Sequence, residues 1–258
     1  MILEHAEKEE EKKDTAESQK VELTVKDLPF QANEALNTLR ANIMLSGYGV
    51  KVVCLTSSFK HEGKSSLSFR LAMSFAALDK KTVFLDCDIR NSRTIGRYKV
   101  QGKTSGLSTY LCNDMPLLDV IYHTTNEHLD IIFAGDVAPN PSELFSGSRF
   151  NEMLQELKNR YDYVIVDTPP VNAVIDGVLI AKQCDGTVLV VESGVTDRVQ
   201  AQRAKQQLDY AGVKILGVAL NKLGTKKSGY GYGYGYGYGR YGYGHYGYGE
   251  GYGYGKKK

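Results

Sequence analysis

The fold of this chain is decided by the stretch VVCLTSSFKHEGKSS, which runs from Val52 to Ser66. It begins as a short apolar, β-branched run, breaks into a polar loop, and ends in Gly-Lys-Ser ahead of a helical pattern. This order predicts a strand, a phosphate-binding loop and a helix. Gly63 lets the backbone approach phosphate oxygens, Lys64 can place a positive charge on them, and the Ser65 hydroxyl can ligate Mg²⁺.

The loop departs from the usual pattern G-x-x-x-x-G-K-[ST], because Ser58 holds the place of the first glycine. A bare Gly-Lys-Ser triplet also occurs by chance, and an ordinary strand–turn–helix connection would look the same. The rest of the chain must therefore decide whether this loop binds phosphate or is an ordinary connection. If the loop binds a nucleotide, the residues expected to face it are Ser58, Lys60, His61, Glu62, Gly63, Lys64, Ser65 and Ser66.

The length, charge and cysteine content of the chain limit the class of protein to which it can belong. The chain has 258 residues, enough for one large α/β domain with its own core, and a formal net charge of +2, too small to suggest a nucleic-acid binder. Its four cysteines are scattered without a C-x-x-C pair, which fits reduced thiols better than disulfides or a zinc site. No apolar run approaches the roughly 20 residues that span a bilayer, and the N-terminus is unlike a signal peptide. We expect a cytoplasmic protein.

Three regions are expected along the chain. Residues 1–27 are dense in charge and form a flexible arm, residues 28–223 form the folded domain, and residues 224–258 form a disordered Gly-Tyr tail. The tail is either a linker that associates with itself through its aromatic rings, or an array of phosphate acceptors. Its eleven tyrosines are Tyr230, Tyr232, Tyr234, Tyr236, Tyr238, Tyr241, Tyr243, Tyr246, Tyr248, Tyr252 and Tyr254.

Strands and helices are predicted to alternate through the folded domain. Continuous apolar runs predict strands at 52–56, 82–85, 129–133, 163–166, 186–192 and 214–220. Helical periodicity predicts helices at 33–46, from the phosphate loop to 79, and at 105–112, 142–145, 148–160, 175–183 and 198–210. The first should begin at the cap Asn33 and carry Ala35, Leu36, Leu39 and Ile43 on its apolar side. Such alternation predicts an α/β fold, a mostly parallel sheet with helices on both faces.

Carboxylates follow two of the predicted buried strands. Asp86 and Asp88 end the run 82–85, and alternation along an extended chain puts them on the same side. Asp167 ends the run 163–166 and leads into Thr168-Pro169-Pro170. Ligands of open α/β sheets bind at the carboxyl ends of the strands, so these side chains predict a divalent cation beside the phosphate loop.

Together the three motifs resemble the Walker A, Walker A′ and Walker B set of the bacterial tyrosine kinases (BY-kinases) of capsular and exopolysaccharide biosynthesis, relatives of the MinD/ParA P-loop ATPases. The resemblance covers about Leu28 to Leu223 and includes the segments LTSS…EGKS, FLDCDIR, DYVIVDTPP and PNPSEL. The tyrosine-rich C-terminus is a further mark of this family. The resemblance implies an ATP- and Mg²⁺-dependent protein-tyrosine kinase that phosphorylates its own tail in trans and regulates polysaccharide synthesis and export.

The family resemblance also implies roles for individual residues. Lys64 and the loop backbone would hold the ATP phosphates, and Ser65, Asp88 and Asp167 would hold Mg²⁺. Asp86 and Asp88 are the candidates for the base at the acceptor hydroxyl, with Asp86 preferred. Asn221, after the last predicted strand, would contact adenine, although it also suits a simple turn.

Some residues depart from the family pattern. Lys60 and His61 stand where proline and glycine are usual, so His61 either lies exposed or crowds the phosphate. The signature lysine of MinD/ParA proteins would fall at Phe59 and is absent, which favours a kinase. The oligomerisation motif E-x-x-R-x-x-R is represented by Glu34 and Arg40, with Asn37 in place of the first arginine. Loss of that arginine weakens the case for a ring of subunits.

Partners follow from the resemblance as well. It implies a separate membrane adaptor that activates the kinase at the inner face of the cell membrane, and a tyrosine phosphatase. Self-association is expected through the helix at 33–46 and through the tails. The tail has six Lys and Arg residues against one Glu, and each phosphate added to a tyrosine would offset this positive charge by roughly −1.5 to −2. Two other hypotheses remain: a MinD/ParA-like ATPase, and a non-catalytic nucleotide-binding scaffold with a self-associating tail.

Overall fold

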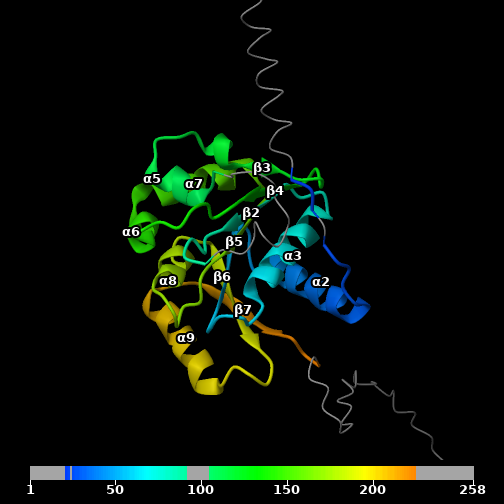
Figure 1. The fold of residues 1–258 in the computed structure, drawn as a ribbon. Coiled ribbons are helices and arrows are strands. Elements are labelled where there is room, and N and C mark those ends of the chain that lie inside the picture. The colour runs from blue at the N-terminus through cyan, green and yellow to red at the C-terminus, as the bar shows by residue number, and fades with distance from the viewer. Residues whose placement is uncertain (1–20, 24, 92–104, 225–258) are drawn as a thin grey trace, which may run out of the picture. The chain divides into compact units, whose positions relative to one another are not determined.

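The computed structural model describes residues 21–23, 25–91 and 105–224, and within them the chain forms one seven-stranded sheet (Figure 1). The strand order is β3-β4-β2-β5-β1-β6-β7, and every neighbouring pair is parallel except β3 and β4. The strands are β1 (Val52–Ser57), β2 (Thr82–Asp86), β3 (Tyr122–His123), β4 (Leu129–Ile132), β5 (Tyr163–Asp167), β6 (Gly186–Glu192) and β7 (Ile215–Asn221).

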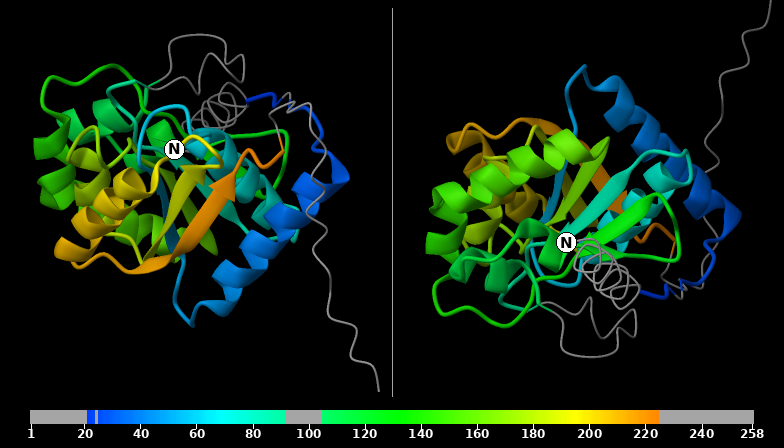
Figure 2. Two further views of the ribbon diagram at one scale, coloured as in Figure 1. Left: turned by 90° about the horizontal axis from the view of Figure 1, so that it is seen from below. Right: turned by 90° about the horizontal axis from the view of Figure 1, so that it is seen from above.

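Helices cover both faces of the sheet (Figure 2). Helices α2 and α3 pack on one face, and α5 to α9 pack on the other. The helices are α2 (Phe30–Leu45), α3 (Lys64–Ala76), α5 (Leu107–Cys112), the 3-10 helix η1 (Leu117–Val120), α6 (Pro141–Ser146), α7 (Ser148–Arg160), α8 (Asp176–Ala181) and α9 (Arg198–Tyr210). The predicted mostly parallel, doubly covered sheet is confirmed.

Strand β1 is central and has neighbours on both edges. Val53 lies opposite Ile165 of β5 and Gly186 of β6, and all six residues of the strand are buried. Val53 packs with the α3 side chains Phe69 and Phe75 on one face. Because both faces are covered, the strand reads as a continuous apolar run rather than an alternating one. The loop that follows β1 is therefore anchored by a fully buried strand.

Several element boundaries differ from the prediction. Helix α2 begins at Phe30, so Asn33 lies inside it, where its N–H donates to the Pro29 carbonyl and caps nothing. Ala35 is exposed, whereas Leu36 and Ile43 are buried as predicted. Helix α3 ends at Ala76, three residues early, because the chain continues as turns through Asp79.

The antiparallel strand β3 was not predicted. It has two residues, Tyr122 and His123, and so shows no periodicity of its own. It is held in place by pairing with β4, and Val21 adds a parallel bridge at Thr124. This edge therefore depends on tertiary pairing rather than on local propensity.

Two predicted regions fall largely outside the described residues. Residues 1–20 and 225–258, which include all the tail tyrosines, are not among those described, so the flexible arm and the disordered tail stay predictions. In the described part of the chain, no helix has the length and apolar character needed to cross a bilayer.

Asp185 fixes the start of β1. Its Oδ2 accepts the backbone N–H groups of Lys51 at 2.9 Å and Val52 at 2.8 Å, and its Oδ1 accepts the Lys158 ammonium. Burial opposes ionisation of this carboxyl, but these donors outweigh it and lower the pKa of Asp185. The ionised Asp185 carboxylate is therefore more stable in the native state than in the unfolded chain. This difference adds to the stability of the fold above a pH of about 4.

We expect Asp185→Asn to lower the free energy of unfolding by about 1–2 kcal/mol at pH 7. Because the folded pKa lies below the unfolded one, the wild-type advantage is lost as pH falls below about 4, and the two proteins converge. Urea unfolding at pH 7 and at acidic pH measures both values. The control Asp209→Asn, at an exposed i,i+4 pair with Lys205, should change stability by less than about 0.5 kcal/mol. A gap between Asp185→Asn and wild type that stays constant with pH would contradict this account.

Candidate active site

A cavity of about 210 Å³ opens at the carboxyl ends of β1, β2 and β5. This is the edge at which open α/β sheets bind ligands. The walls are mostly polar and come from the loop after β1 and from the residues that end β2 and β5. The lining residues are Ser57, Phe59, Lys60, His61, Glu62, Gly63, Lys64, Ser65, Ser66, Asp86, Asp88, Asn91, Asp167 and Pro170.

The loop between β1 and α3 has the backbone geometry of an anion cradle. Gly63 has φ 89°, and a Cβ there would lie 2.2 Å from the Asn221 amide nitrogen, so glycine is required for both reasons. Helix α3 begins at the next residue, Lys64, and its first three residues line the cavity, so the positive end of the helix dipole lies at the cavity. His61 also has a positive φ, 72°, and its side chain is exposed and lines the cavity, so whether it crowds a bound phosphate stays a prediction.

Lys64 and Asp167 form a buried ion pair. Lys64 Nζ lies 2.8 Å from Asp167 Oδ1 and 3.1 Å from Ser65 Oγ, and the side chains of Lys64 and Asp167 are 6% and 1% exposed. Ser68, one turn into α3, donates its hydroxyl to the same carboxylate oxygen at 2.9 Å. The ammonium predicted for phosphates and the carboxylate predicted for the cation thus lie together in one cavity.

Asp86 and Asp88 line the same cavity, as their spacing predicted. Asp86 lies opposite Asp167 on the adjacent strand, is buried, and accepts the Asp88 N–H at 3.1 Å. Asp88 is half-buried, and this burial raises its pKa while nearby Lys64 partly offsets the rise. Between them, burial and the Asp86 charge raise the pKa of the Cys87 thiol, which keeps it protonated and apolar.

The donor set suits a hard cation bound together with phosphates. Ser65, Asp86, Asp88 and Asp167 offer only oxygen atoms, which Mg²⁺ prefers. Among the described residues, no group of three or more His, Cys, Asp or Glu side chains is arranged to hold a metal by itself. Mg²⁺ usually keeps several waters and is bound through one or two carboxylates plus substrate phosphates.

Three residues predicted to bind nucleotide lie differently from the rest. Ser58 and Asn221 are not part of the cavity lining, and Ser58 is fully buried. The Asn221 amide donates to the Glu62 carbonyl at 2.9 Å and accepts the Lys222 N–H at 2.9 Å. The Glu62 side chain is buried and accepts the Phe59 N–H and the Thr196 hydroxyl. The Asn221 and Glu62 side chains therefore hold the loop through these hydrogen bonds, and nucleotide contacts by Ser58, Glu62 and Asn221 remain predictions.

A network behind the Asp86-Cys87-Asp88 segment was missed. Arg90 Nε donates to Asp176 Oδ2 at 2.6 Å, and its Nη2 lies 3.2 Å from Asp176 Oδ1 and 3.3 Å from Ser142 Oγ. Ser142 donates to Asp176 at 2.7 Å, and Asp176 is buried at the first position of α8. This network ties the loop after β2 to α6 and α8. The partners are distant in sequence, and no local pattern predicts their pairing.

The residues predicted for oligomerisation lie on α2. The Asn37 amide donates to Glu34 Oε1 at 3.1 Å. Arg40 reaches back to α3, where its Nη1 donates to the carbonyl and hydroxyl oxygens of Ser74, both at 2.6 Å. Arg40 therefore helps to dock α2 onto α3 within one subunit, and its role between subunits, with Glu34, stays a prediction.

Known proteins resemble this chain in sequence and in fold. The AAA domain family model matches residues 50–194. The tyrosine-protein kinase CpsD of Streptococcus agalactiae is 40% identical over 200 residues, which cover 78% of this chain and 87% of that protein. The kinase domain of the Escherichia coli tyrosine kinase ETK superposes with a TM-score of 0.71 at 32% identity, covering 82% of this chain and 87% of that one.

Two further structures place the fold. The chimerical protein CapA2B2 superposes with a TM-score of 0.69 at 34% identity, covering 72% of this chain and 83% of that one. The septum site-determining protein MinD of Pyrococcus horikoshii, complexed with Mg-ADP, gives 0.59 at 21% identity, covering 69% and 72%, a likeness of fold alone. The fold is thus the MinD-like P-loop fold. With this identity and coverage, the chain belongs to the bacterial tyrosine-protein kinases.

Proposed function

We propose that this kinase transfers phosphate from ATP, with Mg²⁺, to the tyrosines of its own C-terminal tail, with one subunit acting on another. The observation that carries the proposal is the meeting of the Gly63-Lys64-Ser65 loop, Asp86, Asp88 and Asp167 around one cavity. A tail with eleven tyrosines in 29 residues supplies many acceptors to that cavity.

Phosphoryl transfer depends mainly on positioning and on stabilising charge. The N–H groups of the loop and of the first turn of α3, with the Lys64 ammonium, hold and neutralise the phosphate oxygens. A phenol has a pKa near 10, so its proton has to be received by a base as the new bond forms. Asp86 is proposed as that base and Asp88 as the alternative, since both carboxyls line the cavity.

Ser65, Asp88 and Asp167 are the residues proposed to hold Mg²⁺, which neutralises charge on the phosphates when bound. In the structure Lys64 neutralises Asp167. Asp167 would therefore have a cationic partner both before Mg²⁺ binds, from Lys64, and after it binds, from the metal. The buried Asp167 ends β5, the half-buried Asp88 follows the neighbouring strand β2, and both line the cavity.

Mass spectrometry of the purified chain after incubation with ATP and Mg²⁺ tests the proposal. We expect several phosphates per chain, all between Tyr230 and Tyr254, and none in Lys64→Met. Mixing Lys64→Met with wild type should restore phosphate to the mutant's tail, because the reaction runs between chains. A variant with all eleven tail tyrosines changed to Phe is the matched control and should carry no phosphate while still binding ATP.

Other outcomes would favour the alternative functions. Release of ADP without phosphotyrosine, repeated in the presence of a membrane-adaptor peptide, would indicate a MinD/ParA-like ATPase. ATP binding with neither product would indicate a nucleotide-binding scaffold whose tail only associates with itself. A MinD/ParA-like switch is disfavoured by Phe59, which stands in the place of the signature lysine.

We further propose that a membrane adaptor on a separate chain recruits and activates this kinase at the inner face of the membrane. The similarity to CapA2B2, which is a chimera by its name, supports a partner of that kind. Co-expression with a candidate adaptor should move the kinase into the membrane fraction and raise its phosphotyrosine content. An unchanged distribution and phosphate content would refute this part of the proposal.

Regulation is proposed to follow the charge of the tail. Unphosphorylated tails and the α2 residues Glu34 and Arg40 would promote self-association, accumulated phosphate would oppose it, and a tyrosine phosphatase would reset the cycle that controls polysaccharide synthesis and export. Light scattering with and without ATP and Mg²⁺ tests this part. The idea fails if the all-Phe tail variant and wild type show the same sizes under both conditions.

A further inference from the structure

The phosphate loop holds a backbone conformation that its sequence does not favour. His61 has φ 72°, in the left-handed region that favours glycine. A side chain in this region costs about 1–2 kcal/mol, and such a conformation persists only when the surroundings impose it. Neighbouring contacts must therefore hold His61 in this shape.

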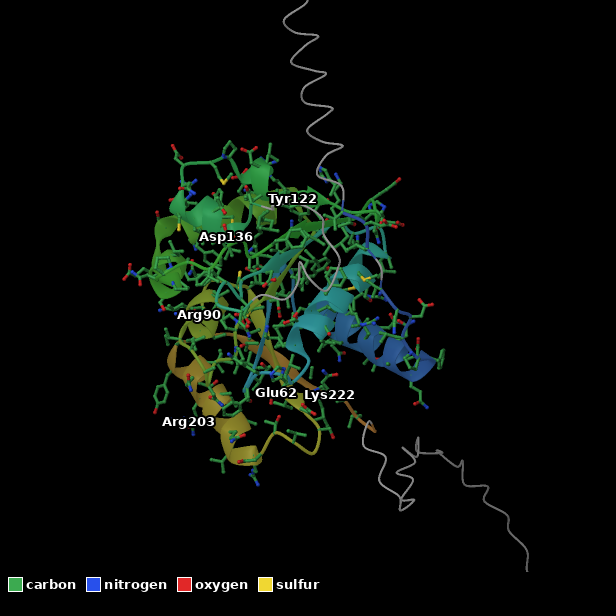
Figure 3. All side chains as sticks on the ribbon, in the orientation of Figure 1. Glu62, Arg90, Tyr122, Asp136, Arg203 and Lys222 are labelled. Atoms are coloured by element: carbon green, nitrogen blue, oxygen red, sulfur yellow. The ribbon has the colours of Figure 1, made fainter. Side chains whose placement is uncertain are left out.

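Those contacts come from the edge of the sheet. We call the four residues Glu192, Thr196, Asn221 and Lys222 the edge clamp; they lie at the end of β6, in the turn after it, and at the end of β7. Figure 3 shows Glu62 of the loop and Lys222 of the clamp next to each other. More than 125 residues separate the loop from every member of the clamp.

The edge clamp donates hydrogen bonds to two successive carbonyl groups of the loop. Lys222 Nζ donates to the His61 carbonyl at 2.6 Å, and the Asn221 amide donates to the Glu62 carbonyl at 2.9 Å. Glu192 Oε2 lies 2.8 Å from the same ammonium and fixes its position. The Thr196 hydroxyl donates to the Glu62 carboxylate, so both the backbone and the side chain of Glu62 are held.

Holding these carbonyls also sets the direction of N–H groups. In a trans, planar peptide the C=O of one residue and the N–H of the next point in opposite directions. With the His61 and Glu62 carbonyls turned toward the clamp, the N–H groups of Glu62 and Gly63 are turned away from it. Successive N–H groups held in one loop form the anion cradle of a phosphate site.

We propose that Lys222 is a positioning residue for ATP, which holds His61 in the left-handed conformation so that the loop keeps its phosphate-binding shape. Lys222 does not line the cavity and acts through the loop. The proposal rests on the proposed nucleotide site and deepens it. It also explains why histidine is tolerated at position 61, where the backbone conformation favours glycine.

Isothermal titration of ATP into the full-length chain, with Mg²⁺ present, tests the proposal. We expect Lys222→Ala to raise the Kd for ATP by about five- to tenfold, because the pre-formed loop is lost. The KM for ATP in tail phosphorylation should rise by a similar factor while kcat changes by less than about twofold, because the groups at the reacting atoms are intact. Lys222→Arg keeps a donor and should recover most of the affinity.

The decisive control is the same substitution in a His61→Gly background. Glycine adopts a positive φ at no steric cost, so the loop no longer needs the ammonium, and Lys222→Ala should then change Kd by less than about twofold. Lys205→Ala removes an equal charge from exposed α9 and should leave Kd unchanged. Thermal unfolding of each variant confirms that it is folded.

Either of two results would overturn the proposal. The first is a Kd for Lys222→Ala equal to that of wild type, and the second is the same loss of affinity in the wild-type and the His61→Gly backgrounds. The second result would mean that Lys222 acts by charge alone or on the whole fold. A wild-type chain that binds no ATP would instead refute the nucleotide site itself, so the two failures are distinguishable.

Discussion

Lys64→Met is expected to lower kinase activity by at least about 10²-fold and to lower the free energy of unfolding by about 3 kcal/mol. The loss of activity follows from removing the cation that neutralises the phosphates. The loss of stability follows from Asp167, which is 1% exposed and would keep the Ser68 hydroxyl but lose the ammonium 2.8 Å away. A buried carboxylate without its cationic partner is strongly destabilising.

The two effects separate in the double variant Lys64→Met/Asp167→Asn. Removing the carboxylate charge as well leaves no unpaired ion, so the unfolding free energy should return to within about 1 kcal/mol of wild type while activity stays lost. Urea unfolding and tail phosphorylation are the two measurements. A single variant as stable as wild type would show that Lys64 does not neutralise Asp167 in solution.

Asp86→Asn is expected to lower kcat for tail phosphorylation by about 10²–10⁴-fold while the Kd for ATP changes little, if Asp86 is the base. Asparagine keeps the size of the side chain and its acceptor for the Asp88 N–H, so the loop should stay in place. Single-turnover phosphorylation and ATP titration give the two values.

Asp88→Asn provides the direct comparison. If it lowers kcat more than Asp86→Asn does, the base is Asp88, and the half-burial that raises the pKa of Asp88 would be part of its role. Asp119→Asn, at an exposed position on η1, should leave both kcat and Kd unchanged. Full activity in both Asp86→Asn and Asp88→Asn would remove carboxylate base catalysis from the proposed mechanism.

The fold and the centre of the site were predictable from the sequence for a shared reason. Strands buried on both faces are continuous apolar runs, and their carboxyl ends meet at one edge of a parallel sheet. Gly63, Asp86, Asp88 and Asp167 each directly follow or closely trail such a run, so their meeting around one cavity followed from the fold class.

The supports of the site were not predictable in the same way. Arg90, Asp176 and Lys222 contact groups tens of residues or more away, and their partners are chosen by loop geometry rather than by a repeating pattern. Arg40 was predicted from its spacing in the oligomerisation motif, yet its long side chain reaches Ser74 on the neighbouring helix. Spacing locates the Cα of a residue on one face of a helix, whereas a long side chain can reach beyond that face.

The placement of β1 between β5 and β6 has a consequence for the order in which the chain becomes structured. The partners of β1 are roughly 110 residues later in β5 and 130 residues later in β6. A ribosome makes the chain from the N-terminus at about 5–20 residues per second, so this apolar strand emerges many seconds before either neighbour exists. Nascent chains that have not yet reached Gly186 would leave one edge of β1 unpaired and open to aggregation. A chaperone that binds apolar segments would therefore need to stay longest on β1, the strand that leads into the phosphate loop.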